Sequence, residues 1–392
     1  MAVTKLPRNV KALAAVSFLT DVASEMIYPL LPLFLSSVLG VSAAALGVIE
    51  GAAESISSLL RLPAGWLSDK FGRRKPLVVL GYTLAAFARP LIGLAQNVGQ
   101  VLAIRLTDRF GKGVRTAPRD ALIADSVSPA QRGYAYGLHR ASDSLGAVLG
   151  PLIAWALLSL GVVELRGLFL WAALPGLLAV LLVIVMVKET AAQPKPKPEP
   201  IPGLTAEGLG APFWRYLAVV FLFTLSCSSD AFLLLRVSQL GVPTAMVPIL
   251  WAMLHVVKSS SSLVSGWLSD RVGRSRLILG GWLIYTAVYL GFAFASTAWH
   301  AWALFLVYGL FFGMTEGVEK ALVADLVPVR RRGTAFGWFN AAVGLASLPA
   351  SVVFGIVWDG AGVEAAFVMA AGVAALATIA FPLVVASPKL SR

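Results

Sequence analysis

The sequence is poor in charge and in cysteine, and each shortage excludes a class of protein. Only 13% of the 392 residues are charged, 58% are hydrophobic, and the mean hydropathy is +0.81. These values exclude a soluble globular domain. The single cysteine, Cys227, excludes an intrachain disulfide and a multi-cysteine metal site, and we expect neither a metal nor another cofactor.

What the chain has instead is a series of long apolar runs along its whole length. A helix of about 20 apolar residues crosses a hydrocarbon core of roughly 30 Å, whereas strands of a membrane barrel are shorter. The sequence therefore predicts an all-α integral membrane protein with twelve spans. They are residues 11–39, 43–68, 74–95, 98–125, 131–160, 166–187, 212–239, 243–268, 275–295, 300–327, 331–358 and 362–385.

One hydrophilic stretch divides these spans into two groups of six. It reads KETAAQPKPKPEPIPGLTAEG and is rich in proline and charge, so it is typical of an extended linker rather than a helix interior. We therefore predict an N-terminal bundle over 1–187, a cytoplasmic linker over 188–211 and a C-terminal bundle over 212–392.

The net charge of +12 has a distribution typical of membrane topology. Basic residues gather in alternate loops, which is the positive-inside asymmetry, and nucleic acid binding is not expected. Both termini, the linker and the loops after even-numbered spans are predicted to be cytoplasmic. The residues that carry this pattern are Lys70, Arg73, Arg74, Lys75, Lys188, Lys195, Lys197, Arg271, Arg274, Arg276, Arg330, Arg331 and Arg332.

Two motifs occur once in each half of the chain. GWLSDKFGRR begins at Gly65 and GWLSDRVGRS at Gly266, and their residue numbers differ by 201. DALIADSVSPAQRGYAYG begins at Asp120 and KALVADLVPVRRRGTAFG at Lys320. The halves are therefore predicted to be a duplicated six-helix unit, arranged as two pseudo-symmetric bundles around an axis along the membrane normal.

The sequence here resembles the major facilitator superfamily, and the resemblance covers nearly the whole chain. The segment from Gly65 is similar to that family's motif between helices two and three, and the segment from Gly266 is a weaker copy. The resemblance implies that Asp69 meets the positive end of a helix in the opposite half, and that Arg73 joins a charge network that closes the cytoplasmic side. The alternative is a solvated basic loop.

The glycines of this motif have a physical interpretation. Gly65 and Gly266 are expected to let helix backbones approach closely, and Gly72 and Gly273 to permit tight turns. The full set of predicted gating residues is Gly65, Asp69, Gly72, Arg73, Arg74, Asp270, Gly273 and Arg274.

The fifth span carries a second motif, formed by Gly137, Gly146, Gly150 and Pro151. It resembles the antiporter motif of drug:proton exporters in the same superfamily, although Ala154 and Trp155 stand where paired glycines are expected. The resemblance implies proton-coupled export. The alternative is close helix packing with a proline kink.

The fourth span carries Asp108, Lys112, Arg115 and Arg119 on one helical face. Because a charge facing lipid costs several kcal/mol, this face is predicted to line a cavity, to pair internally or to lie near the cytoplasmic end. Arg105 and Arg109 flank it, and for them a structural ion network is the alternative. The candidates for the substrate cavity are Lys112, Arg115, Tyr28, Lys258, Asp230 and Glu316.

Carboxylates one turn apart are the candidates for proton coupling. In a low dielectric they disfavour each other's ionisation, which suits groups that bind and release protons near neutral pH. Glu25 and Glu54 are the first candidates, with Asp21 and Asp143 next. A neutralising salt bridge, for instance between Glu54 and Arg115, is the alternative.

Together these features predict a secondary active transporter rather than an enzyme. It moves a small solute across a prokaryotic cytoplasmic membrane by alternating access, as a proton-coupled exporter and a monomer in the lipid bilayer. No Walker A sequence is present, which disfavours transport driven by ATP. The alternatives are an importer or exchanger of a polar or anionic metabolite, and a non-transporting receptor.

Overall fold

The computed structural model describes residues 6–128, 131–189, 208–328 and 331–385. All regular structure in these residues is helical. Eleven of the helical segments are long and apolar enough to cross a membrane. The predicted all-α membrane fold is therefore confirmed.

The helices agree closely with the predicted spans. In the first half of the chain they are α1 (Arg8–Glu25), η1 (Tyr28–Leu30), α2 (Leu31–Ser37), α3 (Ala43–Phe71), α4 (Lys75–Leu91), η2 (Ile92–Leu94), α5 (Val98–Asp125), α6 (Arg132–Ser159), α7 (Leu165–Trp171) and α8 (Ala173–Met186). In the second half they are α9 (Gly210–Ser226), α10 (Asp230–Gln239), η4 (Thr244–Met246), α11 (Val247–Val272), α12 (Arg274–Phe294), α13 (Ala298–Leu326), α14 (Arg332–Ala361) and α15 (Val363–Val384).

The first predicted span is not one continuous helix. It is interrupted by the 3-10 turn η1, whose second residue is Pro29, and α2 carries Pro32 as its second residue. Proline lacks the backbone N–H that a helix interior requires, so the interruption follows from the sequence. The turn places Tyr28 beside the end of α1.

Helix α5 is the predicted span that falls outside the eleven apolar segments. It has 28 residues, which at 1.5 Å per residue makes it about 42 Å long, so its length suffices to cross a bilayer. Its composition differs because Arg105, Asp108 and Arg115 lie on it, and all three are buried inside the protein. These charges are therefore covered by neighbouring helices.

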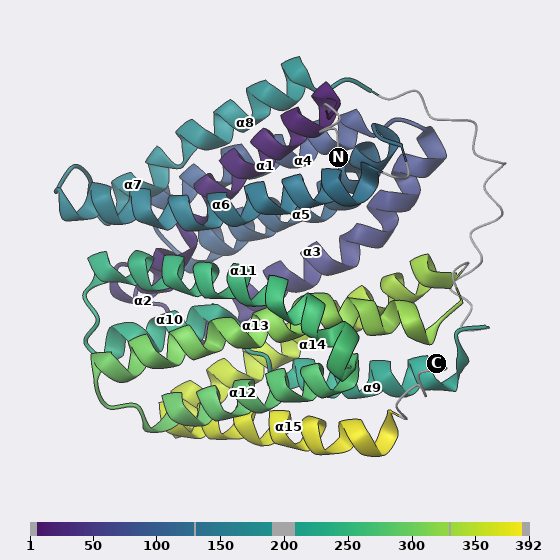
Figure 1. The fold of residues 1–392 in the computed structure, drawn as a ribbon. Coiled ribbons are helices and arrows are strands. Elements are labelled where there is room, and N and C mark those ends of the chain that lie inside the picture. Colours follow the sequence, from purple (N-terminus) through teal and green to yellow (C-terminus); the bar gives the residue numbers. More distant parts are fainter. Residues whose placement is uncertain (1–5, 129–130, 190–207, 329–330, 386–392) are drawn as a thin grey trace. The chain divides into compact units, whose positions relative to one another are not determined.

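The chain forms two compact units. The first contains residues 1–34 and 56–200, and the second contains 35–55 and 201–392. In the first unit α1 lies against α6 and α8, and α4 against α5 and α8; in the second, α12 lies against α13 and α15, and α9 against α14 and α15 (Figure 1).

The bundle boundaries predicted at 187 and 212 stay predictions. Residues 190–207 of the predicted linker lie outside the described residues. Helix α3 is divided between the units, since its residues up to Ser55 group with the second unit and those from Ile56 onward with the first.

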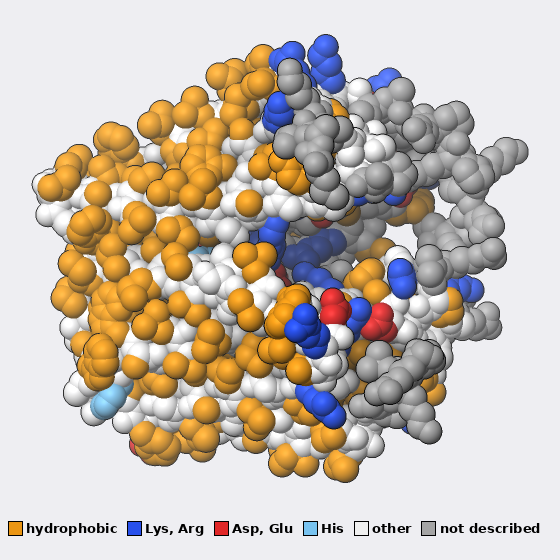
Figure 2. Space-filling view, in the orientation of Figure 1, with side chains coloured by type: hydrophobic (Ala, Val, Ile, Leu, Met, Phe, Trp, Pro, Cys, Tyr) orange, Lys and Arg blue, Asp and Glu red, His pale blue; other side chains and the backbone are white. Residues whose placement is uncertain are grey.

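The outer surface of the helices is apolar. On the face shown in Figure 2, hydrophobic side chains are spread over much of the surface, and Lys and Arg side chains gather toward one end of the helices. Large apolar side chains are strongly exposed, for example Leu263 at 81% and Leu383 at 80%. An exposed apolar surface of this kind suits contact with lipid acyl chains.

Glycines bring the helices of the first unit into backbone contact. A Cβ on Gly81 of α4 would overlap the carbonyl oxygen of Gly111, and one on Gly111 would lie 2.6 Å from the carbonyl oxygen of Gly81. On α6, a Cβ at Gly146 would lie 2.6 Å from the Phe18 carbonyl oxygen, and one at Gly150 would lie 2.7 Å from that of Val22. Helices α4 and α5, and α1 and α6, therefore meet at distances that only glycine permits.

In the second unit, glycines likewise let α14 pack closely against the first half of α3. A Cβ at Gly51 would lie 3.0 Å from the Cα of Leu348, and one at Gly355 would lie 2.8 Å from the Cα of Ala44. The carboxylate of Asp359 accepts hydrogen bonds from the backbone N–H groups of Ala43 at 3.1 Å and Ala44 at 2.8 Å. A carboxylate at the N-terminus of a helix also interacts favourably with the helix dipole.

Two glycines of α6 provide a matched test of this packing. Gly150→Ala should destabilise the protein by about 1–3 kcal/mol, because the added methyl group clashes with the α1 backbone. Gly137→Ala should be tolerated, because a Cβ there meets no atom within 4 Å and alanine favours helix. Thermal unfolding of both variants in detergent measures the difference. Equal melting temperatures would contradict the packing at Gly150.

Candidate functional site

The first unit encloses a small polar pocket between α1, η1, α4 and α5. Its volume is about 50 Å³. It is lined by Asp21, Ser24, Glu25, Ile27, Tyr28, Arg89, Arg105, Asp108, Arg109, Lys112 and Arg115. Five of these side chains are basic and three are acidic, so the pocket has more positive than negative groups.

Asp108 is the centre of the ion pairs in this pocket. Its Oδ1 lies 3.0 Å from Nε of Arg89, and its Oδ2 lies 3.5 Å from Nη1 of Arg105 and 3.9 Å from Nε of Arg109. Asp108 is only 3% exposed. Arg89 also donates from Nη1 to the carbonyl oxygen of Thr20 at 2.9 Å, so α4, α5 and α1 are joined at one point.

The aromatic ring of Tyr28 lies against two of these arginines. The guanidinium carbons of Arg105 and Arg109 lie 5.7 and 5.9 Å from its ring centre. Such a cation–π contact favours the charged side chains. The structural ion network considered for Arg105 and Arg109 is therefore present.

Arg115 differs from the other arginines of the pocket. It is 4% exposed, and its guanidinium lies 4.5 Å from the ring centre of Tyr82. Its Nη1 donates a long hydrogen bond of 3.4 Å to the Gly81 carbonyl oxygen, and its Nε has no hydrogen-bond partner. Among the described residues no carboxylate forms an ion pair with Arg115.

The structure brings some of the predicted site residues together and leaves others apart. Asp21, Glu25, Tyr28, Lys112 and Arg115 all line the pocket. The other two coupling candidates do not line it. Glu54 lies in the part of α3 that belongs to the second unit. Asp143 of α6 lies near enough to Asp21 to interact with it electrostatically, and it pairs with His139, Oδ2 to Nδ1, at 3.4 Å.

The remaining cavity candidates belong to the second unit. Lys258 of α11 pairs with Glu316 of α13, with 2.9 Å between Nζ and Oε2. Asp230 accepts a hydrogen bond of 2.7 Å from the hydroxyl of Tyr308. In the parts of the chain that are described, no group of three His, Cys, Asp or Glu residues could hold a metal ion.

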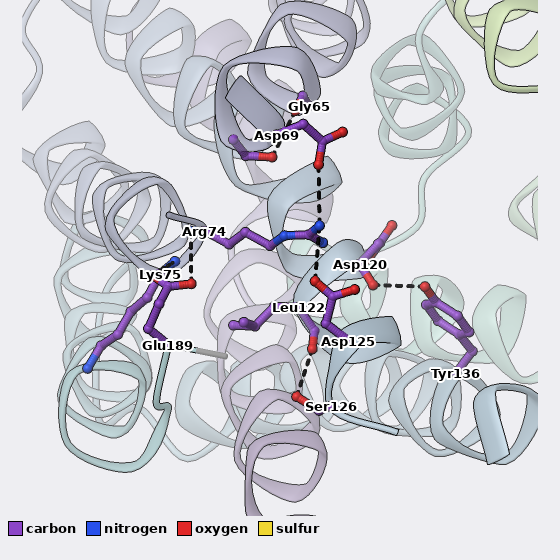
Figure 3. Close-up of polar contacts among 11 residues, drawn as sticks. Gly65, Asp69, Arg74, Lys75, Asp120, Leu122, Asp125, Ser126, Tyr136 and Glu189 are labelled. Carbon is purple, nitrogen blue, oxygen red and sulfur yellow. Dashed lines mark hydrogen bonds and ion pairs between the residues drawn. The ribbon is translucent and has the colours of Figure 1, made fainter. Parts of the chain in front are cut away.

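The predicted gating loop of the first unit is built around Arg74 (Figure 3). Arg74 is 6% exposed, and its Nη2 lies 3.3 Å from Oδ1 of Asp69 and 3.0 Å from Oδ2 of Asp125. The carboxylate of Glu189 accepts hydrogen bonds from the backbone N–H groups of Arg74 at 3.0 Å and Lys75 at 2.9 Å, at the start of α4. The ends of α3 and α5 are thus tied to the start of α4.

The resemblance implies that Arg73 belongs to a charge network, but in the structure Arg73 is exposed. The ion pairs of the loop are made by the next residue, Arg74.

The second copy of the motif repeats one of these ion pairs. Arg274 pairs with Asp325, with 2.6 Å between Nη1 and Oδ2, and also donates to the Ala321 carbonyl oxygen. The residue numbers of both partners differ by 200 from those of Arg74 and Asp125. Asp270, the counterpart of Asp69, is exposed.

The two copies of the motif agree in their turn glycines and differ in the glycine that begins each motif. Gly72 and Gly273 have φ angles of +60° and +91°, which glycine adopts without strain, so both provide the predicted turn. A Cβ on Gly65 would lie 3.3 Å from Cβ of Ala117, which is a close approach to α5. The prediction for Gly266 is wrong, because a Cβ there meets nothing within 4 Å and the position faces open space.

Sequence reasoning missed Arg89, Asp125 and Asp325. Beyond the first turn of its span, Arg89 is the one basic residue among apolar residues, and such a residue requires a partner in the protein interior. Asp125 and Asp325 lie in the repeated segments ALIAD and ALVAD. Both signals were therefore available in the sequence.

Comparison with known proteins places this geometry in a family. The model of the Major Facilitator Superfamily matches residues 13–318 and 256–392. An MFS-type transporter of Methanocaldococcus jannaschii is 35% identical over 361 residues, which are 90% of this chain and 89% of the relative.

More distant relatives extend the comparison. The multidrug resistance protein MdtG of Enterobacter lignolyticus is 29% identical over 326 residues, 78% of this chain and 75% of that protein. A solved structure of a bacterial homologue of the human lysosomal transporter Spinster matches with a TM-score of 0.77 and 17% identity, over 97% of this chain and 96% of that one. At this identity the match supports the fold alone.

The ion pairs of Asp108 predict a large effect on stability. Asp108→Asn should destabilise the protein by about 3–5 kcal/mol, because two buried arginines and the partly buried Arg109 lose their counter-charge. Asp120→Asn is the matched control on the same helix: Asp120 pairs with Arg119 at 2.8 Å, but its side chain is 44% exposed, so a loss below about 1 kcal/mol is expected. Unfolding of both variants in detergent compares them. An Asp108→Asn protein as stable as the control would show that the ion pairs contribute little.

Proposed function

Because the chain belongs to the major facilitator superfamily and is a multi-pass membrane transporter, we propose that it exports a small solute across a cytoplasmic membrane in exchange for protons. In this proposal the two six-helix bundles alternate in access, both termini are cytoplasmic and the protein works as a monomer.

The pocket of the first unit carries the proposal of proton coupling. Asp21 and Glu25 lie one helical turn apart on α1 and line the same pocket as Lys112 and Arg115. Ionised carboxylates disfavour each other at this spacing, whereas nearby basic groups favour ionisation. In this pocket the two effects act on the carboxylates in opposite directions. Binding or release of a solute in the pocket would shift the balance between them, so the carboxylates are suited to bind and release protons during transport. Glu54 and Asp143 remain further candidates.

Two observations support the direction of transport. Gly146 and Gly150 occupy the contact of α6 with α1, Pro151 follows in the same helix, and their spacing resembles the antiporter motif of drug:proton exporters. A relative over 78% of this chain has the name of a multidrug resistance protein. Export is therefore the direction that we propose.

The gating role of the duplicated loops also stands as a proposal. Arg74 and Arg274 each join the start of one helix to an aspartate at the end of another, in equivalent places of the two halves. We assign Asp69, Arg73 and Arg74, with the glycines Gly65 and Gly72, to one gate, and Asp270, Gly273 and Arg274 to the second.

An importer or exchanger of an anionic solute is the second candidate. It is favoured by one observation, the five basic and three acidic side chains that line the pocket. A basic pocket suits a negatively charged solute.

Everted membrane vesicles distinguish these functions. Respiration acidifies the vesicle interior, and an exporter that exchanges solute for protons releases this gradient when solute is added outside. An importer that carries solute and protons together releases it only when the solute is loaded inside. The added solutes are ethidium and a small-molecule extract of bacterial cytosol, and vesicles without the protein correct for passive leakage. If solute releases the proton gradient neither when it is added outside nor when it is loaded inside, the proposed proton coupling is wrong.

The coupling role of Glu25 gives a prediction for the same vesicles. Glu25→Gln should abolish solute-driven proton release and retain exchange of labelled for unlabelled solute, because exchange needs no net proton transfer. Glu164→Gln is the control, since Glu164 precedes α7 outside the pocket. If Glu25→Gln keeps the proton release of the unmodified protein, the coupling group lies elsewhere, with Asp21→Asn, Glu54→Gln and Asp143→Asn as the next variants.

A further inference from the structure

We propose that the pocket of the first unit binds an oxyanion group of the transported solute, with Arg115 as its main ligand and Lys112 beside it. The solute is thus an organic carboxylate or a phosphate. This inference rests on the proposed transport function but not on the direction of transport.

The charge of the pocket is the first argument. Even with Asp21, Glu25 and Asp108 all ionised, the five basic side chains leave an excess of two positive charges. Excess charge inside a membrane protein is costly unless a counter-charge or water compensates it. An anionic group in the pocket would supply this counter-charge.

The second argument is that the arginines of the pocket differ in their partners. Arg89 and Arg105 are held by Asp108, so they form the framework of the pocket. Arg115 is almost fully buried, lines the same pocket and has an Nε donor with no partner. Buried donors are satisfied in the great majority of cases, so an unsatisfied guanidinium donor at a pocket wall points to a ligand.

The surroundings of Arg115 hold its guanidinium in place without using all of its donors. The Tyr82 ring lies 4.5 Å away, and the Tyr82 hydroxyl is itself buried without a hydrogen-bond partner. The backbone crossing at Gly81 and Gly111 brings Cβ of Arg115 against α4. A planar guanidinium held in this way matches the two oxygens of a carboxylate or phosphate.

The size of the pocket limits what enters it. About 50 Å³ accommodates a few water molecules or one compact group, and a polycyclic drug is much larger. The walls are mostly polar, unlike the apolar walls typical of drug-sized ligand pockets. The charged group of the solute therefore fits the pocket, while the rest of the solute lies outside it.

Binding to the purified protein tests this proposal without any transport. The probes are inorganic phosphate, acetate and succinate, each compared with chloride at equal ionic strength, and ethidium serves as a cationic probe. Calorimetry and thermal shift should show binding of at least one oxyanion and none of chloride. If none of the three oxyanions binds, the proposal is wrong.

Variants of Arg115 connect the binding to the pocket. Arg115→Gln should weaken oxyanion binding by about ten- to a hundredfold, as expected for the loss of a charge-assisted hydrogen bond. Its melting temperature without ligand should stay near that of the unmodified protein, because no carboxylate loses an ion pair. Arg115→Lys, which keeps the charge but not the planar fork, should show an intermediate affinity. Lys11→Gln is the control for the loss of one positive charge, since Lys11 is exposed on α1.

Three results would overturn the assignment. The first is oxyanion binding that is equally strong in Arg115→Gln and in the control. The second is an Arg115→Gln protein that melts far earlier and is restored by Asp21→Asn, which would make Arg115 a structural ion-pair partner. The third is ethidium binding that depends on Arg115 while oxyanions do not bind. Loss of proton release in the vesicles, with oxyanion binding intact, would instead contradict only the proposed proton coupling.

Discussion

The requirement to compensate buried charge governs the structure of the first unit. Asp108, Arg89 and Arg105 are buried and Arg109 is partly buried, away from lipid and bulk water, so their charges are compensated mainly by one another. The partners come from α4 and α5, and these helices approach closely enough only because Gly81 and Gly111 carry no side chain. The polar pocket is a consequence of the same arrangement: it is the space left beside an ion network that small residues bring together.

The helices could be predicted from the sequence because lipid imposes a simple rule on composition. A run of apolar residues long enough to cross the bilayer has few alternatives to a helix, and the predicted span 43–68 lies within the apolar helix α3. Helical spacing also placed Asp108, Lys112, Arg115 and Arg119 on one face; the first three line the pocket, whereas Arg119 pairs with Asp120 outside it. Periodicity thus identified which side chains point inward.

Periodicity does not identify the partner of an inward side chain. The neutralising pair considered for Arg115 was Glu54, yet Glu54 lies in the second unit, and the carboxylate that organises the arginines is Asp108. Choosing between these partners requires the distance between helices, which depends on contacts such as Gly81 with Gly111 that are remote in sequence. The same reason explains Arg74, whose partner Asp125 is contributed by the far end of another helix. The repeat in the sequence contained this pair, but only the structure shows that its two members meet.

The division of α3 between the two units has a mechanical consequence. Its first half is held on α14 by Gly51, Gly355 and the Asp359 carboxylate, while Gly65 in its second half lies against α5. Because α3 is a continuous helix, a rotation of either unit would twist the helix around Ser55 and Ile56, where the two units divide it. In the proposed alternating access, the helix would then either bend there or lose the hydrogen bonds between its first turn and Asp359.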